Sequence, residues 1–69
     1  MKMDAKEMFE KLGYTFKEDR LFISYEIDEQ YYFVFHKYPK QIGVGNYHIT
    51  LDELKAINKQ VKELGWLDE

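Results

Sequence analysis

The sequence predicts an α+β fold in which a helix, an antiparallel β-meander of three or four strands and a second helix follow one another. Three observations support this prediction. Complete helix-end signals occur near both ends of the chain, the residues between them alternate between apolar and polar over short runs, and each helix has a single apolar side. Both helices are therefore expected to pack on one face of the sheet.

The first helix is expected to begin at Asp4, a favourable N-cap residue, with Glu7 three residues later completing a capping box. Its apolar face consists of Ala5, Met8, Phe9 and Leu12. Gly13 can adopt the left-handed conformation that ends a helix, and Tyr14 is then placed to fold back onto Phe9.

The second helix shows the same signals, with Thr50 as the N-cap and Glu53 completing the box. The buried stripe is expected to consist of Leu51, Leu54, Ile57, Val61 and Leu64. Gly65 ends the helix, and Trp66 is expected to pack back against Val61.

Strands are expected at residues 14–17, 21–27 and 31–36, with turns at 18–20, 28–30 and around 38–40. A last strand is expected after the third turn, with Lys37 opposite Ile42 and one extra residue, a β-bulge, near Gly45 and Asn46. The resulting cross-strand pairs are Ile27–Tyr31, Tyr25–Phe33, Ile23–Phe35, Phe35–Val44, Phe33–Tyr47 and Tyr31–Ile49. This register makes the whole inner face of the sheet apolar.

The composition indicates one small domain that spans residues 1–69 and has no cysteine. The absence of cysteine excludes a disulfide scaffold, a thiolate zinc site and a cysteine nucleophile. Neither a signal peptide nor a membrane span is expected, because the longest apolar run falls far short of the roughly 20 residues that cross a bilayer. We therefore expect a cytoplasmic protein.

Enzymatic activity is not expected, and no cofactor is implied. His36 and His48 lie roughly 13 Å apart along the expected sheet, too far to share one metal ion. The acidic residues fall at hairpin tips and on helix exteriors, where solubility and turn geometry already place them. The sequence also lacks a nucleophile elbow and a phosphate-binding loop.

The sheet face that points away from the helices is the candidate partner-binding surface. Its expected members are Phe22, Ser24, Glu26, Tyr32, Val34, His36 and His48. Uncovered aromatic surface of this kind marks many interaction sites, and tyrosine is enriched at protein interfaces. Alternatively, these side chains only stabilise a thin sheet, or the first strand or a second copy of the chain covers them.

A single-stranded nucleic-acid binder is a second hypothesis. Bases would stack on Phe22 and Tyr32 beside Lys17, Lys37 and Lys40. Against it stand the net charge of −3, the single arginine and the absence of an RNA-recognition sequence motif. A self-associating structural component is a third hypothesis, in which the chain forms a homodimer.

Residues 49–66 resemble the C-terminal helix of small uncharacterised proteins carried by phages and prophages of Gram-positive bacteria, and residues 5–14 resemble their opening helix. The resemblance implies no catalytic or cofactor-binding residue. It implies an accessory protein that works in the cytoplasm of a bacterial host and binds a host or phage protein, such as a component of host defence. A membrane partner is not implied.

Overall fold

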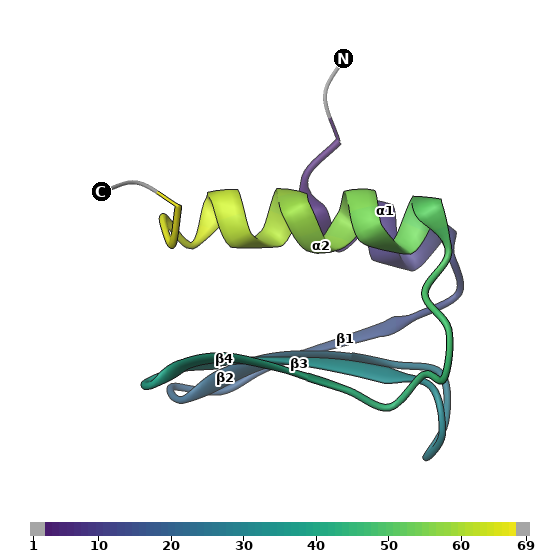
Figure 1. Ribbon diagram of the computed structural model, residues 1–69, viewed down its shortest axis with the longest axis horizontal. Coiled ribbons are helices and arrows are strands. Elements are labelled where there is room, and N and C mark those ends of the chain that lie inside the picture. Colours follow the sequence, from purple (N-terminus) through teal and green to yellow (C-terminus); the bar gives the residue numbers. More distant parts are fainter. Residues whose placement is uncertain (1–2, 68–69) are drawn as a thin grey trace.

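The structure is a computed structural model, which describes residues 3–67. Its elements are α1 (Ala5–Lys11), β1 (Thr15–Glu18), β2 (Phe22–Glu26), β3 (Tyr32–Lys37), β4 (Lys40–Val44) and α2 (Leu51–Glu63). The strands form one antiparallel sheet in chain order, and both helices lie on the same face of it (Figure 1). The predicted fold class is therefore confirmed. Within the described residues, neither helix has the length and apolarity needed to cross a membrane.

Both helices begin with the predicted capping boxes. The Asp4 carboxylate accepts the Glu7 N–H at 2.8 Å, while the Glu7 carboxylate accepts the Asp4 N–H at 3.1 Å. Thr50 and Glu53 make the same reciprocal pair at 3.1 and 3.0 Å. These bonds satisfy main-chain N–H groups that have no partner within the first turn of a helix.

The ends of the helices also follow the prediction. Gly13 and Gly65 have φ angles of 97° and 73°, in the region that a residue with a side chain rarely adopts. The chain then reverses, so that the ring of Tyr14 packs edge-on against Phe9 with centroids 5.7 Å apart. Trp66 likewise returns to the core after α2. The two glycines therefore allow each helix to be followed directly by an aromatic core residue.

Aromatic rings dominate the core between the sheet and the helices. Phe9 of α1 stacks on Tyr25 of β2 with ring centroids 4.0 Å apart. Phe33 and Phe35 of β3 also pack against the Phe9 ring. The buried apolar cluster consists of Phe9, Tyr14, Ile23, Tyr25, Phe33, Phe35, Ala56, Ile57 and Val61. Burying each large apolar side chain contributes about 1.5–3 kcal/mol, so this cluster is the main source of stability in a small chain.

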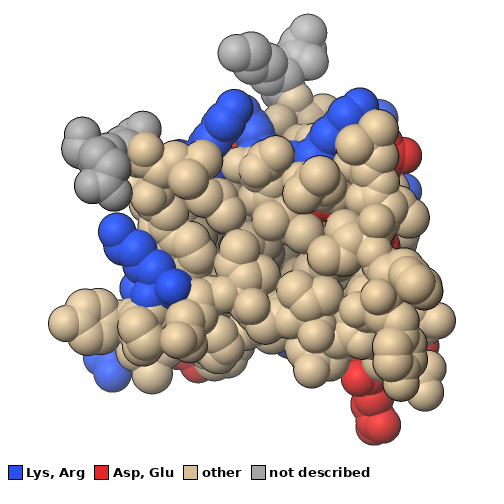
Figure 2. Space-filling view, viewed as in Figure 1, with Lys and Arg blue, Asp and Glu red and all other residues tan. Residues whose placement is uncertain are grey.

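The buried side of α2 differs from the predicted stripe. Leu51 is 66% exposed and Leu54 is 47% exposed, whereas Ala56 and Gln60 are buried. The reason is that α2 packs against α1 as well as against the sheet, which turns its buried arc toward α1. The opposite side of α2 faces the viewer in Figure 2, above β4, where the middle of the surface is almost free of charged side chains.

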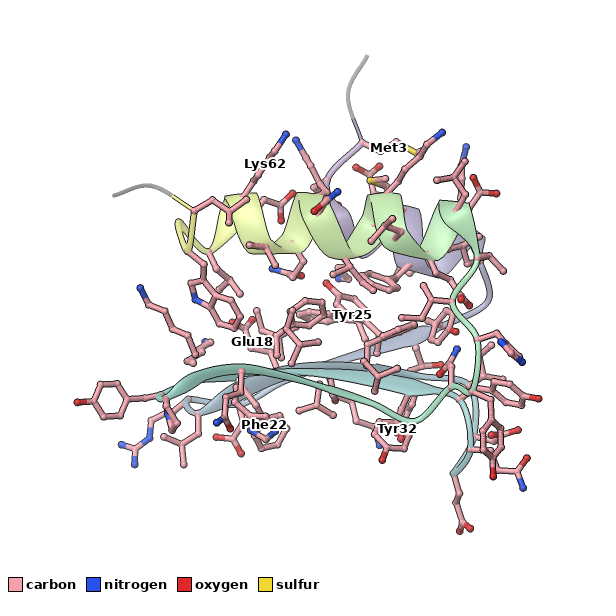
Figure 3. The ribbon with its side chains drawn as sticks, viewed as in Figure 1. Met3, Glu18, Phe22, Tyr25, Tyr32 and Lys62 are labelled. Carbon is pink, nitrogen blue, oxygen red and sulfur yellow. The ribbon has the colours of Figure 1, made fainter. Side chains whose placement is uncertain are left out.

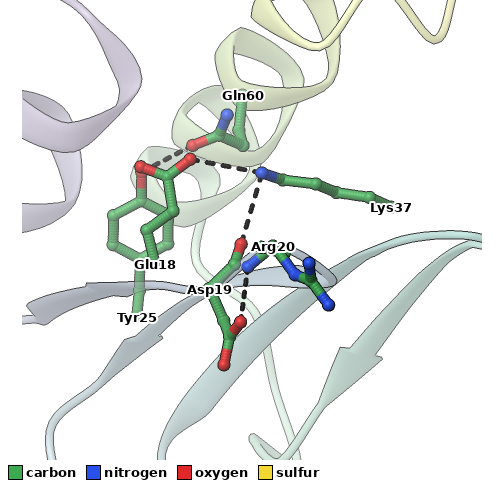
Figure 4. Close-up of polar contacts among 6 residues, drawn as sticks. All are labelled: Glu18, Asp19, Arg20, Tyr25, Lys37 and Gln60. Carbon is green, nitrogen blue, oxygen red and sulfur yellow. Dashed lines mark hydrogen bonds and ion pairs between the residues drawn. The ribbon is translucent and has the colours of Figure 1, made fainter.

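Gln60 is buried because it binds the hydroxyl of Tyr25. Tyr25 points from the sheet toward the helices (Figure 3), and its hydroxyl donates to the Gln60 Oε1 at 2.5 Å (Figure 4). Burial, followed by the nearby Glu63, raises the pKa of Tyr25 well above its ordinary value. The hydroxyl therefore stays neutral and serves as a donor that fixes α2 to the centre of the sheet.

A second polar contact closes the turn between β1 and β2. The Lys37 ammonium lies 3.2 Å from the Glu18 carboxylate and 3.4 Å from the Asp19 carbonyl oxygen (Figure 4). Since Lys37 belongs to β3, this contact reaches across β2 on the inner side of the sheet. The Lys37 ammonium is therefore bound by groups of the same chain.

The register of the last hairpin differs from the prediction. Lys37 lies opposite Lys40, not Ile42, and the intervening turn consists of Tyr38 and Pro39, joined by a cis peptide bond. The ladder pairs are Phe35–Ile42 and Phe33–Val44, so Phe35 does not meet Val44 and Phe33 does not meet Tyr47. The shorter turn keeps the apolar residues on the inner face without the predicted bulge.

The fourth strand also ends earlier than predicted. The Asn46 side-chain oxygen accepts the Tyr32 N–H at 3.0 Å, which replaces the main-chain acceptor that a longer strand would supply. Beyond this point Tyr47 is 96% exposed, and Ile49 lies in the segment before α2, so the predicted Tyr31–Ile49 pair does not form. The Ile27–Tyr31, Tyr25–Phe33 and Ile23–Phe35 pairs are confirmed.

We expect the substitution Tyr25→Phe to lower the free energy of unfolding by about 1–2 kcal/mol, because it leaves the buried Gln60 carbonyl without its donor. Urea unfolding followed by circular dichroism measures this change. Tyr38→Phe is the matched control, since Tyr38 is almost fully exposed and should leave the midpoint unchanged. Equal midpoints for Tyr25→Phe and the wild type would contradict the assigned role of the hydroxyl.

Candidate functional site: the open face of the sheet

Six of the seven residues predicted for the partner-binding surface lie together on the side of the sheet away from the helices. We call this set the outer face. It consists of Phe22, Ser24 and Glu26 of β2 and Tyr32, Val34 and His36 of β3, paired as Phe22–His36, Ser24–Val34 and Glu26–Tyr32. Phe22 and Tyr32 point away from the helices in Figure 3, and no described element covers this side in Figure 1.

The seventh residue, His48, is not part of the outer face. The predicted register set it opposite Tyr32, but β4 ends at Val44 and His48 lies exposed in the segment that leads to α2. The shorter hairpin also changes the partner of His36, which is Gln41 instead of Gly43. The prediction of His48 therefore failed with the register on which it depended.

Tyr32 is held in place by Gly45. A Cβ atom added to Gly45 would lie 2.8 Å from the Tyr32 Cζ and closer still to two other ring carbons. The tyrosine ring therefore lies directly over the glycine main chain, an arrangement that shields a glycine at the margin of a sheet. Because one side of the ring is packed, Tyr32 is only partly exposed and presents its other surface in a defined orientation.

A second glycine, in β4, leaves the sheet surface beside the outer face without a side chain. Gly43 lies opposite Val34, and a Cβ added there would be 3.8 Å from the Val34 Cβ and 3.9 Å from the His36 Nε2. These are ordinary contact distances, so the position has room for a methyl group that the sequence does not supply. The outer face is consequently flat where β3 meets β4.

The only ion pair recorded on the outer side of the described sheet joins Lys17 of β1 to Glu26 of β2, at 2.6 Å. Lys17 lies opposite Ser24 in the ladder, so the pair runs diagonally across the two strands. Both side chains are partly solvated, and a pair of this kind contributes little to stability. Its effect is local, since it neutralises the one carboxylate of the outer face.

The outer face offers apolar contact and hydrogen bonding. Phe22 and Val34 supply apolar surface, while the Ser24 hydroxyl, the Tyr32 hydroxyl and the His36 ring supply donors and acceptors. In the part of the chain that the structure describes, no group of three or more His, Cys, Asp or Glu side chains is arranged to hold a metal ion. The arrangement is suited to binding a flat, partly apolar surface.

A partly buried polar cluster that the sequence analysis missed lies on the inner side, at the end of the sheet nearest the start of α2. The Tyr14 hydroxyl donates to the Glu53 carboxylate at 2.6 Å and accepts from the Asn46 amide at 2.9 Å. Burial and the Glu53 carboxylate raise the pKa of Tyr14 to about 12. The side-chain oxygen of Asn46 accepts the main-chain N–H of Tyr32, so this cluster fixes the segment on which the Tyr32 ring rests. An isolated polar residue after an apolar strand was the only sequence signal.

A shallow pocket of about 220 Å³ lies between the two helices. Its lining residues are Met3, Met8, Lys11, Leu12, Asp52 and Lys55. The methionines and the leucine contribute apolar lining, and the two lysines and the aspartate contribute charged groups. This combination is what remains when two short helices pack side by side, and no side chain in it is aimed at a ligand.

Comparison of the chain with known protein families, with curated proteins and with solved structures gave no match.

We expect Gly45→Ala to destabilise the protein by about 1–3 kcal/mol, because the new methyl group overlaps the Tyr32 ring and forces it to move. The thermal unfolding midpoint measures the loss. The double variant Gly45→Ala with Tyr32→Ala should lose less than the sum of the two single variants, because the ring that clashes is gone. Additive losses would show that the contact is not as described.

We expect the stability of the protein to fall as the pH rises from about 10 to about 12, partly because of Tyr14. Above its ordinary pKa near 10 the tyrosine ionises in the unfolded chain, while the folded protein keeps the proton until about 12. Urea midpoints at pH 8 and pH 11 measure this decline for the wild type and for Tyr14→Phe. The variant should be less stable at pH 8 and should lose less between the two pH values. Parallel declines would refute the assignment.

Proposed function

We propose that the chain is a small non-enzymatic accessory protein of a phage or prophage, which binds a host or phage protein through its outer face. The observation that carries this proposal is the open side of the sheet, where Phe22, Tyr32 and Val34 are only partly buried and no described element lies over them. Flat surfaces with ordered aromatic side chains are favourable docking sites, because little side-chain freedom is lost on binding.

The charges support a protein partner more than a nucleic acid. Of the three lysines that would contact a phosphate backbone, Lys17 is paired with Glu26, and Lys37 is held by Glu18 on the inner side. Only Lys40 of the three remains, and the chain as a whole has a net charge of −3. Affinity for nucleic acid depends on several phosphate contacts by free cations, which the outer face does not provide.

The resemblance to small phage and prophage proteins supplies the setting for this proposal. Accessory proteins of this kind act in the cytoplasm of the bacterial host, where they bind and redirect a host protein such as a component of host defence. A binding module without catalytic residues fits such a role, because occupying a surface of the target is sufficient to change its activity.

The test is capture of a partner by the tagged protein from host-cell lysate, with and without nuclease. We expect a specific protein to be retained after nuclease treatment and to be lost with Phe22→Glu, which buries a charge against the partner. Leu21→Glu is the matched control, because the neighbouring Leu21 is exposed outside β2 and should keep the partner bound. Circular dichroism shows that both variants are folded.

Two results would overturn the proposal. Capture that depends on nucleic acid and falls steeply with salt would favour the single-strand binder. Capture that is equally strong with Phe22→Glu and Leu21→Glu would show that the partner uses another surface. A purified target then gives the affinity directly, and we expect Phe22→Glu to weaken it by at least about tenfold.

A further inference from the structure

The β4 strand forms an open edge of the sheet. In its ladder with β3, the Gly45 N–H donates to the Tyr32 carbonyl at 2.9 Å. Because hydrogen-bonded and non-hydrogen-bonded pairs alternate in an antiparallel ladder, Gly43 also turns its main-chain groups toward β3. The N–H and C=O groups of Ile42 and Val44 therefore point outward, away from the sheet.

The two edges of the sheet differ in how well they are protected. The β1 edge carries Lys17 and Glu18 and contacts α1, whose Lys6 ammonium lies 4.9 Å from the Phe16 ring. Charges and covering elements are the usual protection against pairing with another strand. Residues 41–44 of β4, in contrast, contain no charged residue and no proline. This edge is therefore free to accept a further strand.

Apolar side chains lie above the same edge. Ile42 and Val44 are on the inner face, yet they remain 38% and 40% exposed. Two helices about 10 Å apart cannot fully cover four strands about 4.8 Å apart, and α1 lies toward β1, so the margin at β4 stays open. The helix α2 above it carries the exposed Leu51 and Leu54. Figure 2 shows that the surface of α2 and β4 facing the viewer is almost uncharged in its middle.

We propose that a second copy of the chain occupies this edge, with the two β4 strands paired antiparallel about a two-fold axis. The register that sets apolar residues opposite one another places Ile42 of each copy opposite Val44 of the other. In this register the outward N–H and C=O groups of both residues bond across the interface. The two sheets then form one continuous sheet, with the α2 helices adjacent on the same side.

Symmetry, charge and size favour a second copy over an unrelated strand. A two-fold axis brings identical donors and acceptors into register, so the edge is complementary to itself. No like charges meet within residues 41–44, although each chain carries a net charge of −3. The whole molecule measures 31 × 29 × 20 Å along its principal axes, and α2 and β4 lie on the broad side that faces the viewer in Figure 1. A side of this extent is large enough for the roughly 800 Å² that each partner buries in a standard interface.

The proposed dimer is independent of the outer face, because the pairing uses the edge of the sheet and its inner side. Its consequence for the outer face is geometric. Joining the sheets at β4 places the two outer faces side by side on one continuous surface, with Gly43 of both copies near the axis. A partner that binds this side would meet a larger, still flat surface.

Sedimentation equilibrium of the purified protein, from about 1 μM to about 1 mM, tests the proposal across the usual range of dimer affinities. We expect the mass to rise from 8.4 kDa toward twice that value. Val44→Lys should weaken the dimer by at least about tenfold, because it sets an ammonium group against the apolar Ile42 of the other copy. Leu21→Lys, which adds the same charge at an exposed site outside β4, should leave the dimer intact.

Val44→Pro provides a second test if the lysine variant does not fold. Proline lacks the main-chain N–H, which points outward at Val44. The substitution therefore keeps the ladder with β3 and removes a donor to the second copy. A mass of 8.4 kDa at every concentration would overturn the proposal. A dimer that resists both β4 variants but dissociates with Phe22→Glu would also overturn it, because the outer face would then be the interface.

Discussion

The stacking of Phe9 on Tyr25 is the contact on which the rest of this structure depends. It joins α1 to the second strand, with ring centroids 4.0 Å apart. The same tyrosine carries the hydroxyl that binds Gln60, so one side chain links both helices to the sheet. A chain of this size buries a smaller share of its surface than a larger domain. Concentrating the contacts on one buried ring is how it compensates.

This arrangement also decides which surfaces remain open. Since both helices are fixed to the inner face, the outer face has no cover among the described elements. Since α2 turns its buried arc toward α1, its other side and the β4 edge are left with exposed apolar residues. The two candidate interaction surfaces are therefore consequences of how the core is built. One is a flat sheet face, and the other is a sheet edge beneath a helix.

The two open surfaces differ in how they are ordered. On the outer face, Tyr32 rests on Gly45, and the segment containing Gly45 is fixed by Asn46 and the Tyr14 hydroxyl. A polar cluster on one side of the sheet thus positions an aromatic ring on the other. At the β4 edge, the order comes from the main chain itself, because the ladder with β3 sets the direction of every outward group.

Local signals in the sequence were sufficient for the fold class, both capping boxes, the helix-ending glycines and the pairing of β2 with β3. Each of these depends on residues that are close in the chain, such as Asp4 with Glu7, or on a simple alternation of apolar side chains. Six residues of the outer face followed from that alternation. His48 and the extended fourth strand did not, because their prediction required the length of the Tyr38–Pro39 turn, and apolar alternation was compatible with a longer turn and a bulge.

The sequence by itself therefore determined where the helices begin and end, and which side of the central strands faces the core. Only the tertiary structure decided how α2 is rotated, where β4 ends and which apolar residues remain exposed. Leu54 and Gln60 illustrate the difference. Hydropathy alone assigns the leucine to the core and the glutamine to the solvent. The neighbouring helix and the Tyr25 hydroxyl reverse this assignment, because burial depends on contacts between segments distant in the chain.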